Sequence, residues 1–154
     1  MAFAVAYRKV GVILLEGAQL TYCDLSTKAA RECAFTKKFA QDMIAMLQPD
    51  IVITEDVEAA IYKGQHTKQV TSVIADVADN SEALAVTVAR ERGFRNKYEE
   101  AAHYASKYPQ LVPLKPKPRR SFDKEPRITV IFEAVALAEA VRRNPTPQLA
   151  NALG

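Results

Sequence analysis

The chain has 154 residues, of which 49% are hydrophobic and 25% charged, and it carries a net charge of +3. This size suits a single domain with a sizeable core, and no apolar run reaches the roughly eighteen residues that a membrane-spanning helix needs. The apolar N-terminus is too short for a signal peptide, so we expect a soluble, cytoplasmic protein. We expect one domain over residues 1–144 and a flexible tail over 145–154. Having only two histidines excludes a histidine-rich metal site.

The first half of the chain predicts an antiparallel meander, a helix and a buried strand. Short connections between apolar or alternating runs are typical of strands joined by hairpins. Pro49 ends the helix because proline cannot continue it. The run Ile51-Val52-Ile53-Thr54 predicts a strand that is buried on both faces. The expected bounds are strands at 2–7, 10–15, 19–25 and 51–54, and a helix that begins between 27 and 36.

The second half predicts further helices and one strand, with a proline-rich interruption. A stripe from Val70 to Val77 has helical spacing, and Asn96 can cap a helix. Five of the eight prolines lie within 109–126, which favours an ordered loop or lid over a helix. The expected elements are a loop at 57–65, a helix ending near 79–80, a strand at 84–89 that could instead extend a helix, a helix at 97–107 and a last helix at 127–143.

Two adjacent acids, Glu55 and Asp56, follow the buried strand at 51–54. Acids at the carboxyl end of such a strand lie where open α/β sheets place their ligand crevice. These two residues are therefore candidates for a metal or general-base site. The alternative is a solvated turn, in which the acids have no chemical role.

Positive charge is concentrated in two segments, although the net charge is mild. Such clusters can neutralise phosphates and so indicate nucleic-acid binding. The alternative is that both are ordinary solvated loops. One cluster is Arg90, Arg92, Arg95 and Lys97, and the other is Lys115, Lys117, Arg119 and Arg120, followed by Lys124 and Arg127.

The order of these elements predicts an α/β fold of the ribonuclease H-like type. Three antiparallel strands followed by right-handed crossovers give a mixed five-stranded sheet, with two further parallel strands and helices on both faces. The chain resembles the RuvC-like Holliday-junction resolvases in three places. These are Val10-Gly11-Val12-Ile13, the strand from Pro49 to Glu55, and the helix in which Glu133 precedes Ala134-Val135-Ala136-Leu137-Ala138.

The resemblance implies a metal-dependent endonuclease, a hydrolase of DNA recombination that cleaves branched DNA. It implies that Glu55 and Glu133 hold Mg²⁺ or Mn²⁺ as catalytic residues and that Asp56 assists them. Two divalent ions can hold the attacking water and the leaving oxygen of a phosphodiester. Resolvases of this kind act as two-fold dimers on a two-fold substrate, so the resemblance also implies a homodimer.

The sequence departs from the family pattern at two acids. The aspartate of the first strand corresponds to Ala4 or Ala6, and an acid of the last helix corresponds to Val130. Three functions therefore stay open: a metal-dependent, structure-selective nuclease with a degenerate acidic site, a non-catalytic binder of branched or duplex nucleic acid, and a protein-interaction module on the same fold. The choice between DNA and RNA is also open.

Overall fold

The computed structural model of the chain describes residues 1–91, 93–116 and 128–145. Its strands form one sheet in the order β3-β2-β1-β4-β5. The strands are β1 (Ala2–Ala6), β2 (Lys9–Glu16), β3 (Gln19–Ser26), β4 (Ile51–Glu55) and β5 (Leu84–Val88). The helices are α1 (Cys33–Leu47), α2 (Gln65–Asp79), α3 (Lys97–Lys107), the short 3₁₀ helix η1 (Pro109–Leu114) and α4 (Thr129–Arg143).

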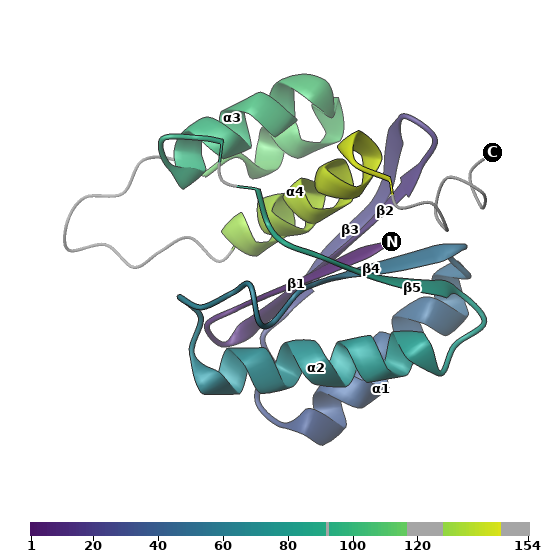
Figure 1. Cartoon of the computed structure of the whole chain (residues 1–154). Coiled ribbons are helices and arrows are strands. Elements are labelled where there is room, and N and C mark those ends of the chain that lie inside the picture. The colour runs from purple at the N-terminus through teal and green to yellow at the C-terminus, as the bar shows by residue number, and fades with distance from the viewer. Residues whose placement is uncertain (92, 117–127, 146–154) are drawn as a thin grey trace.

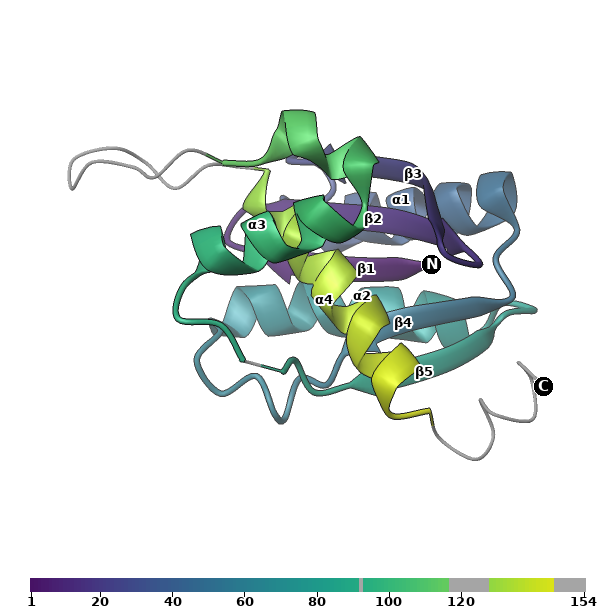
Figure 2. The same ribbon diagram turned by 90° about the horizontal axis from the view of Figure 1, so that it is seen from above.

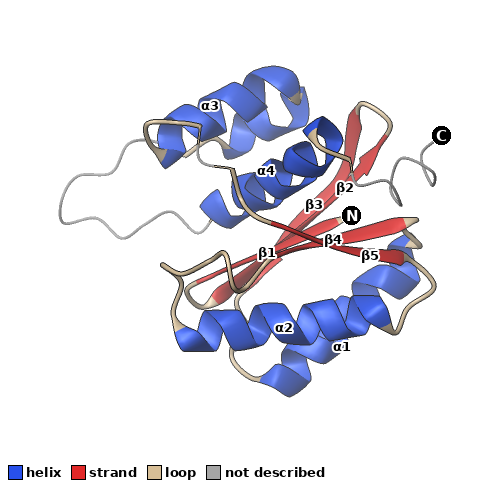
Figure 3. Cartoon of the chain, in the orientation of Figure 1, coloured by secondary structure: helices blue, strands red, loops and turns tan. Residues whose placement is uncertain are grey.

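The sheet is mixed, with β1 at its centre (Figure 3). The pairs β1–β2 and β2–β3 are antiparallel, and the pairs β1–β4 and β4–β5 are parallel. The predicted ribonuclease H-like sheet of three antiparallel and two parallel strands is therefore confirmed. So is the strand at Leu84–Val88, for which the alternative was a longer helix.

Helices cover both faces of the sheet (Figures 1 and 2): α1 and α2 lie on one face, and α3 and α4 lie on the other. The side chains of β1 alternate between the two layers, as a strand's period of two requires. Ala2 and Ala4 belong to the core beneath α4. Phe3 and Val5 belong to the core with α1 and α2.

Small residues let α4 approach the sheet closely. Ala4 is buried at the sheet surface beneath this helix. Gly11 on β2 has no side chain, and a Cβ there would lie 2.9 Å from both Cγ1 and the carbonyl oxygen of Val130. The glycine is therefore needed for helix packing, since the space for a side chain is filled.

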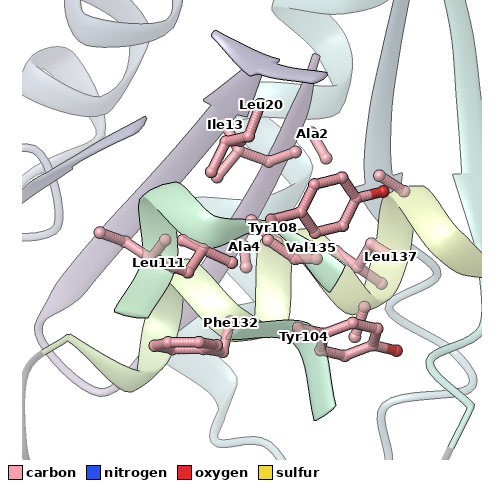
Figure 4. Close-up of a cluster of buried hydrophobic side chains, with 14 of the residues drawn as sticks. Ala2, Ala4, Ile13, Leu20, Tyr104, Tyr108, Leu111, Phe132, Val135 and Leu137 are labelled. Atoms are coloured by element: carbon pink, nitrogen blue, oxygen red, sulfur yellow. The ribbon is translucent and has the colours of Figure 1, made fainter. Parts of the chain in front are cut away.

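A second layer of aromatic and aliphatic side chains packs on the outer side of α4 (Figure 4). Tyr104 of α3, Tyr108 between α3 and η1, and Leu111 of η1 are buried there. Because α4 contacts the sheet on one side and α3–η1 on the other, it is apolar around most of its circumference.

Several boundaries differ from the predictions. The helix α2 begins at Gln65, the last residue of the predicted loop, with Gly64 at its N-cap. The predicted proline-rich loop is wrong at its start, where η1 includes Pro109 and Pro113, which a 3₁₀ turn tolerates. The predicted cap is confirmed, since Asn96 Oδ1 accepts hydrogen bonds at 2.9 and 3.0 Å from two backbone amides of α3. The part of the predicted proline-rich loop from 117 to 126, and the part of the predicted tail from 146 to 154, lie outside the described residues.

Candidate functional site

Glu55 and Glu133 come from distant parts of the sequence and meet at the end of the sheet where β1 and β4 terminate. Glu55 is the last residue of β4 and, by alternation with Ile53, lies on the face toward α4. Glu133 lies in the second turn of α4. Their side chains are only 4% and 14% exposed. Buried carboxylates require partners, because an isolated charge is costly to remove from water.

The ammonium group of Lys63 lies between the two glutamates. Its Nζ is 3.0 Å from Glu55 Oε1 and 3.3 Å from Glu133 Oε2, and it donates a hydrogen bond of 2.7 Å to the carbonyl oxygen of Val5. The contact with Glu55 Oε1 is an ion pair without hydrogen-bond alignment, and among the described residues this oxygen has no hydrogen-bond partner. One lysine thus connects β1, β4 and α4.

A second cation, Arg90, contacts the other oxygen of Glu133. Its guanidinium lies 3.6 Å from Glu133 Oε1 and 2.6 Å from Glu100 Oε1 on α3. Burial disfavours the charged form of Arg90, but the carboxylates of Glu133 and Glu100 outweigh this effect and raise its pKa. We call Glu55, Lys63, Arg90, Glu100 and Glu133 the Lys63 cluster.

Asp56 and Tyr62 lie on the loop that follows β4. Asp56 Oδ1 accepts a 3.0 Å hydrogen bond from the backbone amide of Glu58, so this carboxylate stabilises the turn after the strand. The hydroxyl of Tyr62 lies 3.5 Å from Glu55 Oε2. The structure therefore brings Glu55 and Glu133 together on Lys63 and gives Asp56 a local partner of its own.

The positions of the missing acids lie on the same face of the sheet as the cluster. Ala2 pairs with Ile53, which places Ala4, two residues further along β1, beside Glu55. Ala4 and Ala6 both pack in the core on the α4 side. Val130 is fully buried against Gly11. None of the three residues supplies a side-chain oxygen.

The donor set does not fit a pair of divalent cations. Mg²⁺ takes oxygen ligands in near-octahedral geometry, and a two-metal site needs carboxylates that clamp both ions. Both glutamates here are already bound by protein cations, and a backbone carbonyl at the same point is bound by Lys63. Within residues 1–91, 93–116 and 128–145, no three His, Cys, Asp or Glu side chains form a group that could hold a metal.

Some of the predicted basic residues lie near Glu133, and the others lie outside the residues that the structure describes. Lys115 is exposed just after η1. Arg95 and Lys97 line a cavity of about 240 Å³ beside Phe132 and Glu133. Five predicted phosphate contacts and a member of the other cluster lie outside the described residues: Lys117, Arg119, Arg120, Lys124, Arg127 and Arg92.

Sequence reasoning missed both cations of the Lys63 cluster as partners of the acids. The available signal was their position, since Lys63 lies in the loop after β4 and Arg90 comes two residues after β5. Neighbouring parallel strands have their carboxyl ends on the same side of a sheet, so the residues that follow them are close in space. The clustering of Arg90 with nearby basic residues pointed instead to phosphates.

A separate polar group lies further along α4. The alternative for Glu133 was an exposed helix edge beside Glu139, but Glu139 is itself buried. Its carboxylate accepts hydrogen bonds from Lys107, at 2.6 Å, and from Tyr108. Burial alone would raise the pKa of Glu139, but these hydrogen bonds outweigh it and lower the pKa below its ordinary value. This group connects α3–η1 with α4.

The sheet topology is that of a ribonuclease H-like fold, and the two carboxylates at the end of β4 and on α4 are bound by internal cations. No protein-family model and no curated protein matches the sequence. Solved structures do match its shape. RuvC from Thermus thermophilus has a TM-score of 0.57 and 13% identity, over 92% of this chain and 95% of that one.

Two further matches are structures with Holliday-junction DNA. T. thermophilus RuvC in complex with its Holliday-junction substrate gives a TM-score of 0.61 at 10% identity, over 94% of this chain and 96% of that one. The Fowlpox virus resolvase with substrate Holliday-junction DNA gives 0.53 at 16% identity, over 93% and 98%. At these identities the likeness shows a RuvC-like fold.

No described helix is long and apolar enough to cross a membrane.

Proposed function

We propose that the chain binds branched DNA at the edge of the sheet where β1 and β4 end, and that it does not hydrolyse the DNA. The observation that carries this proposal is the position of Lys63 between Glu55 and Glu133. A lysine at that point neutralises the acids and occupies the place that a catalytic metal would need. Binding to phosphates does not require such a metal, whereas hydrolysis by paired metals does.

The choice of ligand is supported by the matching structures and by charge. Two of these matches were solved with Holliday-junction DNA and cover almost the whole of this chain. The phosphate backbone of DNA is attracted to basic surfaces. Glu55 and Glu133 are paired with Lys63 and Arg90, so their negative charges are neutralised. The residues proposed to contact phosphates are Lys115, Lys117, Arg119, Arg120, Lys124 and Arg127.

Binding is tested by titrating a four-way DNA junction and a duplex of the same length with the protein at several salt concentrations. We expect the junction to bind more tightly. Replacing Lys115, Lys117, Arg119 and Arg120 by alanine should weaken binding and lower the magnitude of the slope of log K against log salt by about 3 to 4. The matched control is Lys37→Ala with Lys38→Ala on α1, in the opposite layer. Unchanged affinity and slope in the fourfold variant would remove the proposed contacts.

A homodimer would suit this ligand, because a four-way junction has two-fold symmetry. Light scattering of the free protein and of the junction complex measures the stoichiometry. We expect two chains for each junction. A single chain bound to each junction would contradict the dimer without affecting the proposal that the chain binds DNA.

The second candidate is the metal-dependent endonuclease. It is favoured by the convergence of Glu55 and Glu133 on one point, with Asp56 close by in sequence. Incubation of the junction with Mg²⁺ or Mn²⁺ tests it directly. Cleavage that persists in Asp56→Asn and disappears in Glu55→Gln and Glu133→Gln would establish hydrolysis and contradict the non-hydrolytic proposal.

A further inference from the structure

We infer that the ammonium of Lys63 is a built-in replacement for a divalent cation, so that the wild-type protein excludes metal from this site and a variant without the ammonium binds it. The geometry, the fixed backbone of Lys63 and the burial of its partners each support this inference. It does not depend on nucleic-acid binding.

The ammonium group of Lys63 carries three protons, and three oxygen atoms surround it. Lys carries three N–H donors, and Nζ faces one oxygen each from Val5, Glu55 and Glu133 at 2.7, 3.0 and 3.3 Å. These oxygens come from the neighbouring parallel strands β1 and β4 and from α4, which packs on the sheet. A compact positive charge thus sits at the point where their negative charge is concentrated.

The backbone on either side of Lys63 is held in place. Its amide donates a hydrogen bond of 3.0 Å to Ala60, and the buried Ala60 donates one of 3.1 Å to the carbonyl of Asp56. Gly64 follows directly and is the N-cap of α2. The side chain of Lys63 is only 12% exposed. The cation is therefore delivered by an ordered turn between β4 and α2.

A divalent ion and the ammonium cannot share this position. An ion bound to Glu55 Oε1 and Glu133 Oε2 would lie within a few ångströms of Nζ, because both oxygens are already within 3.3 Å of it. Like charges at such a distance repel strongly in a partly buried site. If the ammonium is removed, the two buried carboxylates face each other with no charge between them. The two carboxylates and the carbonyl oxygen of Val5 then offer oxygen ligands, which a divalent cation prefers, and water can complete its coordination.

The test replaces Lys63 by methionine, which keeps much of the side chain's length and removes its charge. Tm is measured in EDTA and in excess Mn²⁺, and Mn²⁺ binding is followed by calorimetry. We expect the wild-type Tm to be the same in both conditions. In EDTA, Lys63→Met should melt roughly 10 °C lower, because a buried ion pair has lost one partner. Mn²⁺ should restore at least half of this loss and bind at one ion per chain.

Two further variants make the result specific. Lys38→Met removes an exposed lysine that pairs with Asp42 at 3.3 Å on α1, and we expect neither a Tm loss of more than about 1 °C nor a response to Mn²⁺. The triple variant Lys63→Met, Glu55→Gln, Glu133→Gln removes the cation and both charges together. It should melt above Lys63→Met in EDTA and show no response to Mn²⁺.

Three results would overturn the inference. The first is wild-type protein that binds Mn²⁺ and loses this binding in Glu55→Gln. The second is Lys63→Met that is as stable as wild type in EDTA or gains nothing from Mn²⁺. If Lys63→Met does not fold in either condition, the triple variant decides, and its failure to fold is the third contradictory result. No DNA is used, so a negative outcome here and a failure of the binding proposal are distinguishable.

Discussion

Gly11 shows how a single residue sets the distance between the sheet and the last helix. A methyl group on its Cα would meet the side chain and backbone of Val130 at 2.9 Å. Backbone of a packed helix cannot give way without moving its neighbours. The sequence fragment Val10-Gly11-Val12-Ile13 carried the family resemblance, and the structure gives its glycine a packing role.

We therefore predict that Gly11→Ala destabilises the fold. Overpacking of this kind typically costs about 1–3 kcal/mol in the free energy of unfolding. Urea denaturation measures it, and Gly93→Ala is the control, because a Cβ at Gly93 meets no atom within 4 Å. Equal loss of stability in both variants would contradict the packing argument.

Glu139 gives the protein a defined sensitivity to acid. The pKa of its carboxyl is lowered in the folded state by the hydrogen bonds of Lys107 and Tyr108, against the effect of burial. On acidification the unfolded chain therefore takes up its proton first. The stabilisation is fully present above the ordinary pKa of 4.5 and is lost as the pH falls through the lower folded value.

We predict that Glu139→Gln lowers Tm at pH 7 and that the difference from wild type shrinks as the pH falls below about 4.5. Thermal melting between pH 3 and 7 measures both effects. The control is Glu16→Gln at the exposed end of β2, which should follow the wild-type curve. A Tm difference that stays constant over this pH range would show that the charge of the Glu139 carboxylate does not stabilise the fold.

At the scale of elements, α4 owes its position to a second layer of structure. The 3₁₀ helix η1 contributes Leu111, which is fully buried against the helix side that faces away from the sheet (Figure 4). Its neighbour Val112 is 54% exposed. These adjacent residues have different surroundings on the same short turn.

This contrast predicts different costs for two similar truncations. Leu111→Ala should lower the free energy of unfolding by about 2–5 kcal/mol, because it leaves a cavity under η1. Val112→Ala should change it by no more than about 0.5 kcal/mol. Chemical denaturation of both variants measures the difference, and a similar loss in each would mean that η1 does not anchor α4.

The sequence predicted most elements because their signals were local. Alternation and β-branching indicated the strands, Pro49 ended α1, and Asn96 marked the start of α3. The start of α2 at Gln65 coincides with the last residue of the predicted loop at 57–65. The pairing of Glu55 with Glu133 was expected from the family resemblance. The lysine between them was not, because the spacing of a loop residue does not show where its side chain points.

At the scale of the whole molecule, the sheet has a protected centre and two edges. The central strand β1 is paired on both sides and covered on both faces, whereas β5 pairs with β4 alone and its residues are half-buried or exposed. Local opening is easier where fewer contacts must break. The strands near the centre should therefore open only when the whole domain unfolds.

We predict that amide hydrogens of β1 exchange at the rate of global unfolding, and that those of β5 exchange faster. Hydrogen exchange followed by NMR at several low urea concentrations measures this. The exchange free energies of β1 should fall with urea as steeply as the global value does, and those of β5 less steeply. Equal slopes in both strands would indicate that the sheet opens as one unit.

The position of Lys63 between Glu55 and Glu133 also limits which substitutions this site can accept during evolution. Loss of either acid alone leaves a buried ammonium short of a counter-charge, and loss of the lysine alone leaves two facing carboxylates. Each intermediate is less stable than the starting point. The three side chains are therefore expected to be inherited, or replaced, as a set, so that related chains keep all three or none.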